Sequence, residues 1–232
     1  MRENKWKIFS GSHLKLIAVF TMLLDHIGVL LLPEVSLLRI IGRLSYPIFA
    51  FMIAEGCRYT RNKLRYFLMV FGLGTGCQLV YYFASADNYM NILLTFSCSI
   101  LLIYLLQAVD RAENWKQQFW RSAFFAVGIF IALGIDRLLT IDYGFWGIMT
   151  PVFVAFSQGK GKTGSLLPVL MMAVGLVLLG ADMGGIQYYA LLALPLLLLY
   201  NGKPGKYRMK YFFYLFYPVH LAVLQGIAWL VR

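Results

Sequence analysis

Long apolar runs separated by short polar breaks dominate this chain of 232 residues. A helix of about 20 apolar residues matches the thickness of the hydrocarbon core of a bilayer. Nine spans are predicted, near residues 14–32, 44–57, 65–83, 91–109, 120–138, 143–157, 165–180, 186–200 and 211–230. The second and sixth are short, so a count of about eight to ten spans also fits the pattern. The pattern therefore predicts an all-α, polytopic transmembrane helical bundle that forms one domain over residues 1–232.

Composition supports the membrane assignment. Hydrophobic residues make up 60% of the chain and charged residues only 13%, whereas a soluble domain is about 25% charged. The lipid bilayer, rather than water, is therefore expected to surround most of the chain.

The basic residues predict the orientation of the bundle. The net charge of +11 invites a nucleic-acid partner, but the chain has no soluble basic domain that would bind one, so no nucleic acid is expected. Alternate loops instead hold 17 of the 21 Lys and Arg residues, which places those loops in the cytoplasm, with the N-terminus inside and the C-terminus outside. These residues are Arg2, Lys5, Lys7, Lys15, Arg58, Arg61, Lys63, Arg65, Arg111, Lys116, Arg121, Lys160, Lys162, Lys203, Lys206, Arg208 and Lys210.

Two polar residues lie deep in the first predicted span. Asp25 and His26 are about eleven residues from its inner end, or about 16 Å along a helix, which is near the membrane midplane. A carboxylate at that depth is expected to have a partner, either in a functional site or in a hydrogen-bonded pair that joins helices. Adjacent helical positions point about 100° apart, so the two side chains can have separate partners. His220 in the last span is predicted to lie at the same depth as His26.

Arg39 and Arg43 are four residues apart near the outer end of the second span, on one face if the segment is helical. Such guanidinium groups suit a carboxylate, a phosphate or a developing oxyanion. The alternative is that they pair with acidic residues of the outer side, namely Glu34, Asp136 or Asp142. Ser45 and Tyr46 follow, and Pro47 is expected to bend the start of the helix.

Other polar residues carry open alternatives. Glu55 at the inner end of the second span is interpreted as a salt-bridged surface residue. Asn91 and Asp142 begin the fourth and sixth spans, where Asp142 can simply cap a helix. The basic inner rim suits either the phosphates of a nucleotide or anionic lipid headgroups.

Several sequence segments together resemble a known family. They are Lys15-Leu16-Ile17-Ala18, Met22-Leu23-Leu24-Asp25-His26-Ile27-Gly28, Arg39-Ile40-Ile41-Gly42-Arg43-Leu44-Ser45-Tyr46-Pro47-Ile48-Phe49-Ala50-Phe51, Asp142-Tyr143-Gly144, Tyr200-Asn201-Gly202-Lys203 and Lys210-Tyr211-Phe212-Phe213-Tyr214-Leu215-Phe216-Tyr217-Pro218-Val219-His220-Leu221. The chain resembles the TraX family, named for the protein that acetylates the N-terminus of conjugative F pilin. The resemblance covers nearly the whole chain, and such proteins are similar in turn to multi-pass membrane acyltransferases.

The resemblance implies acyl transfer, most simply from acetyl-CoA, at the bacterial cytoplasmic membrane. His26 matches the intramembrane histidine of such enzymes and is expected to be the general base. Asp25 would orient His26, directly or through a neighbour, or would stabilise the charged form of His26. Arg43, with Arg39 or His220 in reserve, would stabilise negative charge. No metal is required.

The remaining site residues are expected to contact substrate. They are Arg39, Ser45, Tyr46, Asn91, Asp142 and Tyr217. The basic inner rim would hold the phosphates of the acyl-CoA, while an exported peptide, glycan or lipid acceptor enters from the outer side. The resemblance does not single out pilin as the acceptor. A proton-coupled transporter would use the same residues, and a noncatalytic assembly factor would tolerate their loss.

Overall fold

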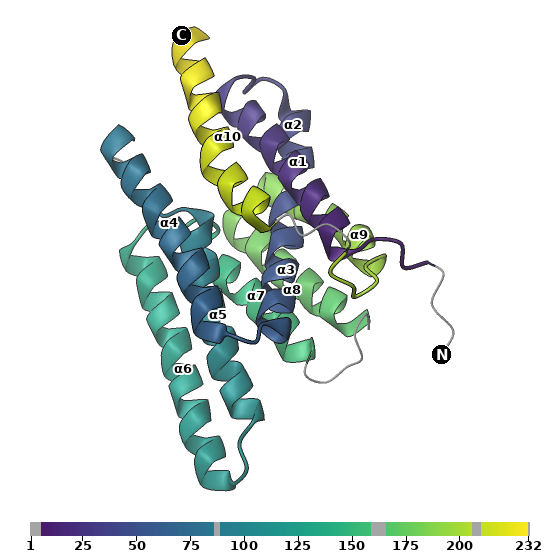
Figure 1. Ribbon diagram of the computed structural model, residues 1–232, viewed down its shortest axis with the longest axis vertical. Helices are drawn as coiled ribbons and strands as arrows, with labels where there is room; N and C mark the ends of the chain where they lie inside the picture. The colour runs from purple at the N-terminus through teal and green to yellow at the C-terminus, as the bar shows by residue number, and fades with distance from the viewer. Residues whose placement is uncertain (1–5, 86–88, 159–165, 206–209, 232) are drawn as a thin grey trace. The chain divides into compact units, whose positions relative to one another are not determined.

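A computed structural model describes residues 6–85, 89–158, 166–205 and 210–231 (Figure 1). The chain divides into two compact units, Met1–Met52 with Thr163–Arg232, and Ile53–Lys162. Six of the basic residues considered above, Arg2, Lys5, Lys160, Lys162, Lys206 and Arg208, lie outside the described residues. The prediction of a single domain stays a prediction.

The first unit contains α1 (Gly11–Leu30), α2 (Ser36–Gly42), the start of α3 (Ser45–Tyr59), α8 (Leu166–Met183), the 3-10 helix η1 (Gly185–Ala193), α9 (Leu194–Leu198) and α10 (Lys210–Val231). Ser10 caps α1 by accepting a hydrogen bond from the backbone N–H of His13 at 3.4 Å. Helix α1 packs against both α2 and α10, and Figure 1 shows α1 beside each of them. Helix α2 also packs against η1. This packing brings residues from distant parts of the sequence next to α1.

The second unit contains the rest of α3, α4 (Lys63–Ser85), α5 (Ile92–Asp110), α6 (Trp115–Leu138) and α7 (Gly144–Gln158). Helix α5 is central, since it packs against α4, α6 and α7. The Ser99 hydroxyl of α5 donates to the carbonyl of Ile148 in α7 at 2.8 Å, so a polar contact joins two apolar helices.

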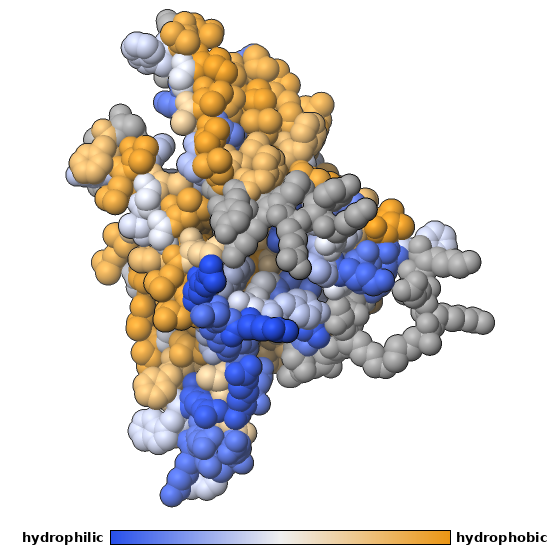
Figure 2. Space-filling view, viewed as in Figure 1, coloured by the Kyte–Doolittle hydropathy of each residue, from blue (hydrophilic) through white to orange (hydrophobic). Residues whose placement is uncertain are grey.

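Six helical segments in the described part of the chain are long and apolar enough to cross a membrane: Gly11–Leu30, Ser36–Tyr59, Lys63–Phe83, Ile92–Asp110, Trp115–Leu138 and Leu166–Met183. Large apolar side chains cover the outside of several of them; on α6, Phe130 and Leu138 are 72% and 84% exposed. Figure 2 shows apolar residues over α6 and α10, with hydrophilic residues gathered where α5 passes into α6. The all-α fold is confirmed, and such surfaces, which suit lipid rather than water, indicate an integral membrane protein. Nine spans and their orientation stay predictions.

Two predicted spans differ in form from the structure. The second span, predicted at 44–57, is preceded by α2, and Ser36–Tyr59 forms a single apolar stretch of 24 residues. Pro47 lies in the first turn of α3, where its missing N–H costs little, and α2 ends just before it. The eighth span, predicted at 186–200, is η1 followed by the short helix α9, which has Pro195 in its first turn.

Candidate functional site

Asp25 is the centre of a buried ionic cluster in the first unit. Its Oδ2 lies 2.5 Å from Nη2 of Arg43, and its Oδ1 lies 3.1 Å from Nη1 of Arg39. Helix α2 supplies Arg39, and Arg43 follows directly at its C-terminal end, so the spacing of four residues places both guanidinium groups at one carboxylate. Both arginines therefore contact Asp25, a carboxylate that was not among the partners proposed for them from the sequence, Glu34, Asp136 and Asp142. A carboxylate as deep in the span as Asp25 was expected to have one partner, and it has two, Arg39 and Arg43. The three side chains carry a formal net charge of +1.

Gly42 allows α2 to approach α1 closely. A Cβ atom added at Gly42 would collide with the Cβ, carboxyl carbon and Oδ1 of Asp25. The absence of a side chain at this position is therefore what lets Arg39 and Arg43, on either side of it, reach the carboxylate.

Gln187 completes the cluster and was missed from the sequence. Nη1 of Arg43 donates to Oε1 of Gln187 at 3.3 Å, and Nε2 of Gln187 lies 3.6 Å from the sulfur of Met183. Gln187 is buried on η1. The available signal was an amide near the start of an otherwise apolar predicted span, where an unpartnered polar group would be costly.

His26 and His220 form a second contact, on α1 and α10. Nε2 of His220 lies 3.0 Å from Nδ1 of His26, and the ring centroids are 4.9 Å apart. The two histidines, predicted from the sequence only to share a depth, therefore touch. Among the described residues Asp25 makes no hydrogen bond to His26, so the two neighbours have separate partners and direct orientation of His26 by Asp25 is not found.

The backbone fixes which nitrogen of His220 carries a proton. Its Nδ1 lies 2.7 Å from the carbonyl oxygen of Phe216, which can only accept, so Nδ1–H of His220 is the donor. In a neutral ring Nε2 of His220 is then an acceptor, and Nδ1–H of His26 must donate to it. With both rings neutral, Nε2 of His26 is the nitrogen at the end of the pair that carries no proton.

Aromatic rings surround His220. Phe216 stacks on it with centroids 4.8 Å apart, and Tyr217 meets it edge-on at 5.9 Å. Tyr217 is half-buried, whereas Ser45 and Tyr46 are buried at the start of α3. Their roles as substrate contacts stay predictions.

Asn91 and Asp142 lie in the second unit. Asn91 caps α5 by accepting from the N–H of Leu93 at 3.1 Å and donates to the carbonyl of Gly74 at 2.9 Å. Asp142 accepts from the Tyr89 hydroxyl at 2.8 Å. These contacts give both residues structural partners, and substrate contact by either stays a prediction.

Glu55 is not a surface residue, as its position near the basic inner rim had suggested. It is 6% exposed, and its Oε1 accepts a hydrogen bond from Nε2 of Gln158 at 2.7 Å. Gln158 is the last residue of α7, and the sequence pattern of neither helix shows that it reaches Glu55.

Comparison with known proteins identifies the family. The family model described as "TraX protein" matches residues 10–228. A Dichelobacter nodosus protein described as "Probable fimbrial assembly protein FimC, serogroup H1" is 30% identical over 248 aligned residues, covering 93% of this chain and 94% of that protein. A Rickettsia prowazekii (strain Madrid E) protein described as "Uncharacterized protein RP591" is 30% identical over 131 residues, covering 56% of this chain and 49% of that protein.

No solved structure matches the chain. The family model, however, spans nearly all of it, including Asp25, His26, Arg39, Arg43 and His220. The chain belongs to the TraX protein family.

Proposed function

We propose that this protein is an integral membrane acyltransferase that moves an acyl group, most simply acetyl, from acyl-CoA to an amine or hydroxyl of an exported or membrane-associated acceptor. The observation that carries the proposal is the contact between His26 and His220. In this contact His26 donates to His220, which in turn donates to the Phe216 carbonyl. TraX membership supports the same reaction class, because the family is associated with pilin acetylation. The protein would carry out this reaction at the bacterial cytoplasmic membrane.

His26 would act as the general base. Nε2 of His26 takes the proton of the acceptor amine or hydroxyl as its nitrogen or oxygen attacks the thioester carbonyl. The tetrahedral intermediate then collapses, the carbon–sulfur bond breaks, and the proton passes to the departing thiolate of CoA. His220 would hold His26 in the required tautomer and orientation through the contact at 3.0 Å.

The arginines would divide two tasks. The side chain of Arg43 is only 7% exposed and lies between Asp25 and Gln187, so its role would be to hold the cluster together. The Arg39 side chain is 30% exposed, which leaves part of its guanidinium available for a developing oxyanion. This favours Arg39 over Arg43, the first choice from sequence, as the group that meets negative charge. Asp25 would fix both cations beside His26.

The relatives suggest the first acceptors to try. One relative carries the printed name of a fimbrial assembly protein, so a subunit of an exported fibre is a natural acceptor to include beside glycans and lipids. Orientation with the N-terminus in the cytoplasm would let acyl-CoA bind from inside and the acceptor from outside.

The test supplies purified protein in lipid nanodiscs with isotope-labelled acetyl-CoA and searches peptide, glycan and lipid fractions for label. Wild-type protein and a His13→Gln control, which changes the helix-cap histidine instead, should transfer label, and His26→Ala should not. A transporter would move substrate across proteoliposomes without a covalently changed acceptor. If no fraction gains label in a His26-dependent way, acyl transfer is refuted.

A further inference from the structure

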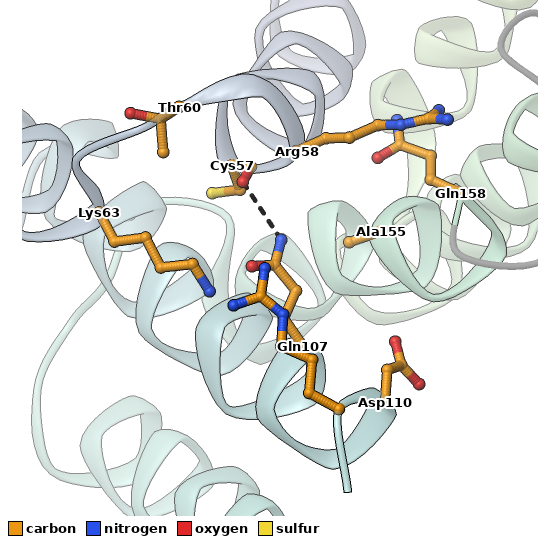
Figure 3. A pocket seen from close by; sticks show the side chains of 9 residues that line it. Cys57, Arg58, Thr60, Lys63, Gln107, Asp110, Ala155 and Gln158 are labelled. Atoms are coloured by element: carbon orange, nitrogen blue, oxygen red, sulfur yellow. Dashed lines mark hydrogen bonds between the residues drawn. The ribbon is translucent and has the colours of Figure 1, made fainter. Parts of the chain in front are cut away.

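A polar cavity of about 250 Å³ lies at one end of the second unit (Figure 3). The end of α3, the start of α4 and the ends of α5 and α7 meet around it. Its lining residues are Cys57, Arg58, Thr60, Lys63, Gln107, Asp110, Arg111, Ala155 and Gln158. These helix ends adjoin loops that are rich in basic residues and are therefore predicted to lie in the cytoplasm.

Three cations and one carboxylate line this cavity. Arg58, Lys63 and Arg111 provide the positive charges and Asp110 the negative one. Within residues 6–85, 89–158, 166–205 and 210–231, none of the three cations has a carboxylate within ion-pair distance. Like charges that share a cavity repel one another, so an anion bound among them would relieve the repulsion.

The surrounding contacts hold this end of the unit in place. The Nζ of Lys63 lies 4.8 Å from the centre of the Tyr104 ring, and the Tyr104 hydroxyl donates to the Lys63 carbonyl at 3.3 Å. Nε2 of Gln107 donates to the Cys57 carbonyl at 3.2 Å, the contact dashed in Figure 3. The Thr60 hydroxyl and the Gln158 amide also donate within the protein, to the Asn62 carbonyl and to Glu55, so the cations are the main donors that remain for a ligand.

We propose that this cavity binds phosphate groups, and that the ligand is the nucleotide end of acyl-CoA; the second part rests on the proposed acyl transfer. Arg and Lys side chains are the usual phosphate partners, with Arg able to donate two parallel hydrogen bonds. A cavity of 250 Å³ is below the range of about 300–1,000 Å³ for sites that enclose a drug-sized ligand, so it suits the phosphates of a longer molecule. The shared chemistry also admits an anionic lipid headgroup.

The first measurement is the dissociation constant of coenzyme A, with inorganic pyrophosphate as a second probe, by calorimetry on the full chain in phosphatidylcholine nanodiscs. Lys63→Met and Arg111→Gln should each weaken coenzyme A binding by about tenfold or more, as expected for loss of a charged hydrogen bond. Arg65→Gln and Lys116→Gln, which change exposed cations of the same rim that do not line the cavity, should change it less than about twofold. Lys63→Arg should keep most of the affinity, and unchanged melting temperatures exclude misfolding.

The source of the phosphate is separated by repeating the titration in nanodiscs that contain phosphatidylglycerol. Strong competition by this lipid that depends on Lys63 and Arg111 would identify a headgroup site and overturn the acyl-CoA assignment. Equal binding of coenzyme A to wild-type protein and the cavity variants would overturn the proposal even if acyl transfer is real. Pyrophosphate binding lost in the cavity variants would sustain the phosphate site even if no acyl transfer is found.

Discussion

Replacing either arginine of the ionic cluster should destabilise the protein by very different amounts. Arg39→Met and Arg43→Met each remove one cation from Asp25 and keep an unbranched side chain of moderate size. The two cations differ in burial, since the side chain of Arg39 is 30% exposed and that of Arg43 only 7%. Burial should therefore decide the cost.

The structure gives the magnitudes. Arg43→Met breaks the 2.5 Å pair with Asp25 and leaves the buried oxygen of Gln187 without this donor, so we expect a loss of about 3–5 kcal/mol. Arg39→Met breaks a partly solvated pair at 3.1 Å, for which about 1 kcal/mol is typical. The difference of at least about 2 kcal/mol corresponds to about 30-fold in the unfolding equilibrium constant.

The assay is reversible unfolding of the purified protein in mixed micelles by added SDS, followed by circular dichroism. A double-mutant cycle with Asp25→Asn should give a coupling to Arg43 of about 2 kcal/mol or more and a much smaller one to Arg39. Equal losses for the two single variants would refute the reasoning. So would an Arg43→Met loss that is unchanged in the Asp25→Asn background.

Three further predictions concern the same unit. Gly42→Ala should cost about 1–3 kcal/mol in the same SDS assay because its Cβ collides with Asp25, whereas Gly72→Ala, which meets open space, should be neutral or stabilising; equal effects would contradict the close approach of α2. Gln187→Leu should cost about 1–3 kcal/mol because Arg43 loses an acceptor, and a shift in melting temperature checks it; no shift would show that the contact is dispensable. His220→Ala should lower kcat for labelled-acetyl transfer by about 10²-fold with little change in the KM for acetyl-CoA, and an unchanged kcat would remove His220 from the mechanism.

Local patterns predicted the helices well because hydropathy and helix length are properties of consecutive residues. The run at 91–109 is α5 (Ile92–Asp110) and the run at 165–180 is α8 (Leu166–Met183). Errors arose where a polar cap extended a helix beyond its apolar run. Asn114 caps α6 through the N–H of Gln117 at 2.9 Å, so the helix begins at Trp115 rather than near residue 120.

The sequence by itself determined that this is a helical membrane protein of the TraX family with a carboxylate and an imidazole buried in its first span. Burial in hydrocarbon demands a partner for such groups, and that demand could be derived from depth alone. Which groups answer it was decided by packing between elements far apart in the chain. The close approach of α2 at Gly42 brings Arg39 and Arg43 into contact with Asp25. The packing of α10 on α1 brings His220 into contact with His26. Hydropathy measures each residue against its solvent, whereas partner choice depends on distances that only the folded chain sets.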